Sequence, residues 1–158
     1  MIRMSEAVLP GHPDKFCDAV AEAIVEECYT VDERAYCQVE MSVWCDQVFL
    51  TGGIATRKPL KRKLEEIVKE VGRNIGYVPP NCIDADRYQV QDHVCKIDKD
   101  PREWTDHVND QCIAIGWAGY DEKVDYLPPE HWLVLKLTKL FINEFGFVMF
   151  SMFVFLKL

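Results

Sequence analysis

The sequence predicts an α+β fold in which a mixed or antiparallel sheet has helices packed on one face. Segments in which polar and apolar residues alternate lie close together in the middle of the chain, whereas segments with helical periodicity fall before, between and after them. Strands that pair locally and helices that collect elsewhere are typical of α+β proteins. The 158 residues suffice for one sizeable hydrophobic core.

The first half of the chain predicts a helix followed by a hairpin. A helix is expected over Pro13–Cys28, because proline suits the first helical position and apolar residues then recur at helical spacing. Residues 36–43 alternate polar and apolar side chains, which is typical of a half-buried strand. A second strand at about 47–56 follows after a short connection, so the two strands are expected to form an antiparallel hairpin.

A second helix is predicted over Lys58–Asn74. Pro59 lies near its start, Gly76 follows its end, and the apolar residues between them share one face. Lysine and arginine residues occupy much of the remainder, and we interpret them as a solvated face rather than a nucleic-acid patch.

The second half of the chain alternates between strands, loops and one helix. We expect a strand at about 87–94, a polar loop over 96–109, a strand over 111–118, a turn at 121–125 and a helix over 131–143. These elements extend the predicted sheet and complete its cover of helices.

The end of the chain, Phe145 to Leu156, is almost entirely apolar. A membrane span needs about 20 apolar residues and this run is shorter, so we do not predict one. A buried strand, a partner interface or a non-native end remain open. We therefore divide the chain into a domain over 1–144 and an apolar tail over 145–158.

Composition indicates a globular protein that could bind an anion only at a local cluster of positive charge. Hydrophobic residues make up 49% of the chain and charged residues 28%, while the net charge of −8 argues against nucleic acid and anionic membranes as partners. The seven cysteines are scattered without a C-x-x-C pair, so we expect reduced thiols, mostly in the core, and a cytoplasmic protein. No signal peptide is expected, and the histidines lack zinc-site spacing.

The segment Gly11-His12-Pro13-Asp14-Lys15 predicts a phosphate-binding turn. The positive end of the helix that begins at Pro13 would face an anion, Lys15 would add positive charge, and Asp14 would hold a divalent cation. An ordinary helix-entry turn with solvated side chains is the alternative for an isolated pentapeptide.

This segment lies in a longer stretch, residues 5–18, that resembles the start of the S-adenosylmethionine synthetases, also called methionine adenosyltransferases. Their pattern is Ser-Glu-x-x-x-x-Gly-His-Pro-Asp-Lys followed by a helix with an early aspartate, as here. In the same order, Thr51-Gly52-Gly53 resembles the first hairpin of the family, residues 72–77 its Ile-Gly-Tyr helix ending, and Asn109-Asp110-Gln111-Cys112 its Gly-Asp-Gln-Gly signature. The resemblance runs from about Arg3 to about Phe145.

The resemblance implies one domain of an enzyme that joins the sulfur of methionine to the 5′ carbon of ATP and displaces triphosphate. It implies Mg²⁺ and K⁺ as cofactors and a dimer, and hence a homo-oligomer or a complementary chain as partner. By residue it implies catalytic roles for His12 and Lys15, ATP or triphosphate binding by Glu6, His12, Lys15, Asp110 and Gln111, a Mg²⁺ ligand in Asp14 and a K⁺ ligand in Glu40.

The chain departs from the family pattern in three places. Ile54 replaces the glutamate of Gly-Gly-Glu that helps to bind methionine, Asn109 and Cys112 replace the outer glycines of the later signature, and the loop over 96–104 is shorter than the gating loop of the family. The resemblance also ends before the later domains that complete the triphosphate site. Three alternatives therefore remain. The chain is a domain that binds ATP and needs a partner chain, a nucleotide or polyphosphate sensor without catalysis, or a structural interaction domain.

Overall fold

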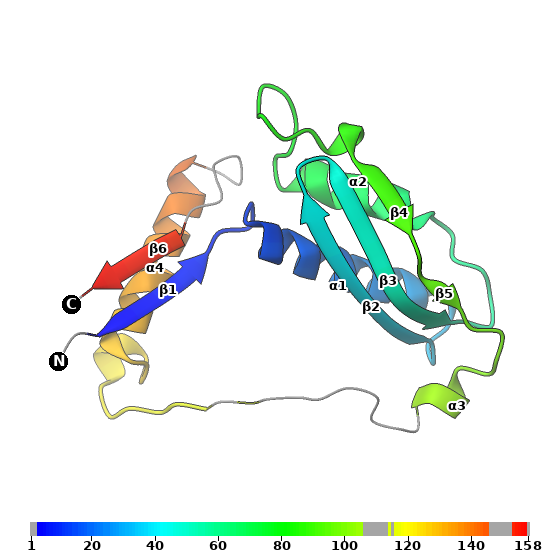
Figure 1. The fold of residues 1–158 in the computed structure, drawn as a ribbon. Coiled ribbons are helices and arrows are strands. Elements are labelled where there is room, and N and C mark those ends of the chain that lie inside the picture. The colour runs from blue at the N-terminus through cyan, green and yellow to red at the C-terminus, as the bar shows by residue number, and fades with distance from the viewer. Residues whose placement is uncertain (1–2, 106–113, 115, 146–152, 158) are drawn as a thin grey trace. The chain divides into compact units, whose positions relative to one another are not determined.

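A computed structural model describes residues 3–105, 114, 116–145 and 153–157 (Figure 1). The chain divides into two compact units, one formed by residues 13–111 and the other by residues 1–12 together with 112–158. The fold is α+β with a mixed sheet and helices, as predicted. The domain boundary predicted after residue 144 stays a prediction.

The first unit is built on a hairpin covered by two helices. Its long elements are α1 (Pro13–Val31), β2 (Tyr36–Trp44), β3 (Gln47–Ala55) and α2 (Leu64–Asn74). The two strands of the hairpin run antiparallel to each other. Their pairing extends from Tyr36, opposite Ala55, to Trp44, opposite Gln47. Figure 1 shows α1 and α2 on the same face of this sheet. The predicted hairpin and the start of α1 at Pro13 are confirmed.

The sheet is mixed because two later strands run parallel to β3. The remaining elements of this unit are the 3₁₀ turn η1 (Ala85–Arg87), β4 (Gln89–Asp92), β5 (Cys95–Lys96) and the short helix α3 (Arg102–Thr105). Both β4 and β5 pair with β3, at different points along its length.

Several predicted boundaries of this unit are wrong. The helix predicted from Lys58 begins only at Leu64, because residues 58–63 form a loop whose backbone N–H groups at Lys61 and Arg62 donate to the carboxylate of Glu27 in α1. The strand predicted over 87–94 is shorter, because only β4 lies within that range, and β5 begins just after it. The predicted loop over 96–109 contains α3 within its described part.

The second unit pairs the two ends of the chain. Strand β1 (Met4–Val8), which the sequence pattern did not predict, pairs antiparallel with β6 (Phe153–Lys157), so part of the apolar tail is a strand. Helix α4 (Pro129–Phe145) packs against β1. Ser5 Oγ and His131 Nδ1 lie 3.0 Å apart and join the two. No helix among the described residues is long and apolar enough to cross a membrane.

Between residues 111 and 128 the structure differs from the prediction. No strand is found at Ala114 or over 116–118, the described part of the strand predicted over 111–118. The predicted turn at 121–125 holds a 3₁₀ turn, η2 (Glu122–Val124), which ends with Asp125 in the left-handed conformation (φ 54°).

Cysteines contribute less to the core than predicted. Of the six described cysteines, all of which are free thiols, only Cys28 is buried, whereas Cys45, Cys82 and Cys95 are exposed. The core of the first unit is instead built from aromatic and branched aliphatic side chains of α1, β3 and α2, such as Phe16, Leu50 and Ile67.

Two buried carboxylates of the α1 region hold the loop over 57–63. Asp32 accepts hydrogen bonds from the backbone N–H of Arg57 (2.9 Å) and from its guanidinium (2.6 Å). Glu27 accepts from the backbone N–H groups of Lys61 and Arg62 and from the guanidinium of Arg62 at 2.9 Å. Burial alone would raise the pKa of Glu27, but these hydrogen bonds outweigh it and lower that pKa. The Arg57 guanidinium holds the pKa of Asp32 well below its usual range.

We expect Glu27→Ala to lower the free energy of unfolding by about 1–3 kcal/mol, because it leaves two backbone N–H groups without their acceptor and removes one of the two carboxylates that pair with Arg62. Urea denaturation at neutral pH measures the change. Glu26→Ala, at an exposed neighbour on the same helix, is the control and should change the free energy far less. Equal effects of both substitutions would contradict the proposed role of Glu27.

Both carboxylates should also make stability depend on pH. Their folded pKa values lie below the unfolded values of about 4.3 for Glu and 3.9 for Asp, so their contribution is present above those values and is lost as the pH falls through the folded pKa values. The urea midpoint should therefore fall progressively as the pH is lowered from about 5, and should keep falling below pH 3 because the folded pKa of Asp32 lies well below its usual range. This fall should be smaller in Glu27→Gln/Asp32→Asn and unchanged in the exposed control Glu26→Gln/Asp98→Asn.

Candidate functional site

The predicted phosphate-binding turn forms the entry to α1. The chain turns at Leu9–His12, where the backbone N–H of His12 donates to the carbonyl oxygen of Leu9 at 2.9 Å. Helix α1 then begins at Pro13, whose missing N–H costs nothing at this position. His12 is buried, with 7% of its surface exposed, whereas Asp14 and Lys15 in the first turn are exposed. Asp14 and Lys15 thus belong to the first turn of this helix, and His12 immediately precedes the helix in the chain.

An aromatic cluster fixes the start of α1. Phe16 is fully buried, its ring stacks on Tyr88 with centroids 5.5 Å apart, and it meets Tyr77 edge to face at 5.2 Å. Burial in this cluster raises the pKa of Tyr77 to about 12. Because Phe16 is next to Lys15, the backbone of the first turn is held on the core while the charged side chains stay accessible.

The first turn of α1 is not strongly cationic by itself. The ammonium of Lys15 lies 3.7 Å from the carboxylate of Asp18, and both side chains are more than half exposed. With Asp14 in the first turn and Asp18 in the second, the start of α1 carries two carboxylates and one ammonium. Burial, reinforced by these carboxylates, raises the pKa of Cys17 to about 11, so its thiol stays protonated at neutral pH.

This charge balance fits a divalent cation shared with a phosphate. The described residues contain no group of three or more His, Cys, Asp or Glu side chains able to hold a metal by themselves. Mg²⁺ is commonly held by one or two carboxylates together with phosphate oxygens of the substrate, and the exposed carboxylate of Asp14 meets that requirement. A bridging cation would cancel the negative charge of the turn and leave Lys15 and the helix N-terminus to attract the anion.

The other predicted site residues lie outside this turn. Glu6 is exposed on β1, where it stands opposite Phe155 of β6. Glu40 is exposed on β2, opposite Thr51, on the face of the sheet that points away from the helices. Asp110 and Gln111 lie outside the described residues, so their predicted role in ATP binding stays a prediction.

The hairpin residues that resemble the family are shaped by a tight backbone contact. Gly52 adopts a φ of 117°, and a side-chain Cβ at this position would lie 2.1 Å from the carbonyl oxygen of Gln38. Only glycine tolerates this geometry. Two residues later, Ile54 is 3% exposed and belongs to the core, so the position at which the family pattern has a glutamate is filled by a buried apolar side chain.

The structure also contains a charged cavity that the sequence analysis does not identify as a site. It lies beside the loop over 57–63, which contains five cationic residues, and that concentration is the signal that could have indicated it. The sequence pattern favours a helix over residues 58–63, and on a helix these cations would form a solvated face. The cavity is therefore not expected from the sequence.

Comparisons with known proteins agree with the fold and the motif order. Residues 1–99 match the family model described as S-adenosylmethionine synthetase, N-terminal domain. An S-adenosylmethionine synthase of Borreliella afzelii is 32% identical over 146 residues, which cover 85% of this chain and 36% of that protein. The enzyme of the same name from Borrelia garinii subsp. bavariensis is 33% identical with the same coverage.

A solved structure shows the same likeness. An S-adenosylmethionine synthetase from Campylobacter jejuni, described as unusual, superposes with a TM-score of 0.58 at 28% identity, covering 63% of this chain and 28% of that one. The chain thus spans about a third of the length of the curated relatives it matches, 36% by alignment. Its turn at His12–Lys15, its hairpin and the segment over 72–77 all fall in the matched region, and the chain belongs to the S-adenosylmethionine synthetase N-terminal domain family.

Proposed function

We propose that this chain binds the triphosphate of ATP together with Mg²⁺ at the entry to α1, as one domain of a methionine adenosyltransferase. The observation that supports the proposal best is that α1 begins at Pro13, so Asp14 and Lys15 lie in its first turn and His12 directly precedes it in the chain. The names of the matched relatives supply the reaction class. The S-adenosylmethionine product forms when the methionine sulfur attacks the 5′ carbon of ATP and triphosphate leaves.

Catalysis of such a displacement needs positioning and charge neutralisation rather than a nucleophilic side chain. In this proposal His12 donates a hydrogen bond to the departing triphosphate, and Lys15 provides a fixed positive charge. Asp14 holds Mg²⁺, which neutralises phosphate charge when bound, while Glu6 and the pair Asp110 and Gln111 approach the nucleotide. Glu40 is the proposed ligand for K⁺.

The proposal does not extend to recognition of methionine, because Ile54 is buried in the core where the family pattern has a carboxylate. This observation favours the second candidate function, a nucleotide or polyphosphate sensor without catalysis. The two functions share the turn at α1 and differ in whether product forms.

We expect Lys15→Ala to weaken binding of Mg²⁺-ATP by about 10- to 100-fold, the effect of losing one charge-assisted contact. Asp14→Asn should weaken it similarly and should also reduce its dependence on Mg²⁺. Isothermal titration calorimetry with and without EDTA measures both effects. Lys61→Ala is the matched control, since Lys61 is an exposed lysine distant in sequence from this turn. Unchanged affinity in both variants would contradict the proposal.

We expect little S-adenosylmethionine from the purified chain alone, because it spans only part of its relatives' length. Product analysis with ATP, methionine, Mg²⁺ and K⁺ tests this, and rapid turnover would contradict it. If a complementary chain restores activity, His12→Asn should lower kcat more than it raises the dissociation constant of ATP. The reason is that its hydrogen bond strengthens as charge develops on the leaving triphosphate.

The chain is also proposed to associate with a second copy or a complementary chain through the sheet face opposite α1 and α2. Trp44 is 80% exposed and Phe49 is 39% exposed on this face, and large apolar side chains in water favour association. Trp44→Glu/Phe49→Glu should shift the protein toward monomer in multi-angle light scattering. Tyr29→Glu, on the exposed side of α1, should not. A monomeric unmodified chain at high concentration would contradict this proposal.

A further inference from the structure

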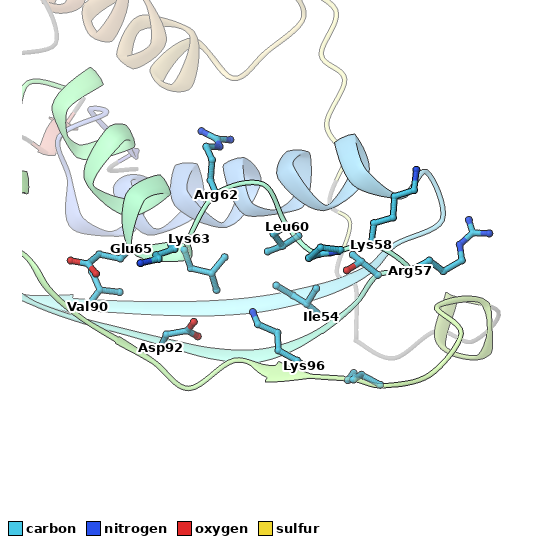
Figure 2. Close-up of a pocket in the computed structure, with 14 residues that line it drawn as sticks. Ile54, Arg57, Lys58, Leu60, Arg62, Lys63, Glu65, Val90, Asp92 and Lys96 are labelled. Carbon is cyan, nitrogen blue, oxygen red and sulfur yellow. The ribbon is translucent and has the colours of Figure 1, made fainter.

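A cavity of about 580 Å³ lies between the loop over 57–63, the start of α2 and the strands β3 to β5. This volume falls within the range of about 300–1,000 Å³ that is typical of small-molecule sites. All of its lining residues belong to the unit formed by residues 13–111. Figure 2 shows the loop and α2 on one side of it and the strands that bear Ile54, Asp92 and Lys96 on the other.

The walls of this cavity combine an apolar floor with cations from two sides. Ile54 and Leu60 provide apolar surface, Lys58 and Lys63 come from the loop, and Lys96 comes from β5. In Figure 2 the side chain of Lys96 extends from its strand toward Ile54 and the loop. Lysines on two facing sides of an apolar cavity are suited to an organic molecule that carries a doubly charged anionic group.

The arginines of the loop are already neutralised, and the lysines are not. Arg57 forms an ion pair with Asp32, and Arg62 forms one with Glu27. Among the described residues, no carboxylate lies within ion-pair distance of Lys58, Lys63 or Lys96. The two buried carboxylates therefore fix the loop in place while its lysines remain available to a ligand.

The acidic side chains of the cavity have partners of their own. The carboxylate of Glu65 is 2.7 Å from the ammonium of Lys69, and Asp92 accepts a hydrogen bond from the backbone N–H of Val94 at 3.0 Å. The start of α2 also lines the cavity through Leu64 and Glu65, and the positive end of a helix favours anions. The local charge is thus cationic in a chain whose net charge is −8.

We propose that this cavity binds a phosphomonoester, a phosphate group attached to a small organic moiety that lies on the apolar floor. A phosphomonoester carries about −1.5 to −2 charges at pH 7, enough to engage lysines from both sides of the cavity. The cavity is separate from the turn at Lys15. The loop beside it is held by Glu27 and Asp32 at the other end of α1. At 1.5 Å per residue, Glu27 lies about 18 Å along the helix axis from Lys15. The inference does not rest on the proposed function.

The test is an NMR titration of the ¹⁵N-labelled chain with adenosine monophosphate in the absence of Mg²⁺. Saturable shifts are expected for the amides of residues 57, 58 and 60–65 and of Lys96 and Ile97. Ribose 5-phosphate and inorganic phosphate should shift the same amides more weakly, whereas adenosine should not. Since the contacts are electrostatic and partly exposed, the affinity should fall as salt is raised.

Substitutions of the lysines separate a built site from general charge. The double substitution Lys63→Gln/Lys96→Gln should weaken binding by about tenfold or more. The separate double substitution Lys63→Arg/Lys96→Arg should retain binding, because arginine keeps the charge. The control Lys61→Gln/Lys99→Gln removes the same charge from two exposed lysines that do not line the cavity and should leave binding within about twofold of the original.

Several results would overturn the proposal. They are shifts confined to residues 11–18, equal weakening in the cavity and control variants, binding of adenosine as strong as that of its monophosphate, or binding of L-methionine at these amides without binding of any phosphate. Well-dispersed spectra of the Lys63→Gln/Lys96→Gln variant show that it is folded, so a loss of binding in it reports on the ligand contacts.

Discussion

The burial of Phe16 between Tyr77 and Tyr88 is the contact on which the rest of the site depends. It joins the first turn of α1 to the segments that follow α2 and precede β4, which are distant in sequence. Removing one fully buried aromatic ring from such a cluster costs several kcal/mol, so the start of α1 has little freedom to move. The exposed charges at Asp14 and Lys15 are therefore presented from a rigid base, which a triphosphate site requires.

The far end of α1 is held by charge rather than by aromatic packing. Glu27 and Asp32 are buried, yet each is satisfied by backbone N–H groups and by an arginine. Because these carboxylates take up both arginines of the loop over 57–63, its lysines remain available to an anion without a metal. At the start of α1, two carboxylates accompany one lysine, so the proposed polyphosphate site needs a cation bound to Asp14. Dependence on Mg²⁺ would therefore distinguish binding at the two proposed sites.

Local patterns in the sequence predicted most of the first unit. Proline at position 13 and the apolar periodicity behind it determine α1, and the alternation over 36–56 determines the hairpin, because both depend on neighbours along the chain. The same locality explains why the sequence alone assigns His12, Asp14 and Lys15 to one turn. The order of short motifs is likewise sufficient to indicate the family to which the chain belongs.

The tertiary structure decided what depends on distant partners. Strand β1 exists because it pairs with β6 at the opposite end of the chain, and the parallel alignment of β4 and β5 on β3 has no signature in a single segment. Residues 58–63 have the composition of a helix start, but the acceptors Glu27 and Asp32 draw the backbone of residues 57, 61 and 62 into a loop. Sequence alone therefore determined the elements whose stabilising contacts are local, whereas strand partners, the loop and its cavity follow from hydrogen bonds between residues far apart in the chain.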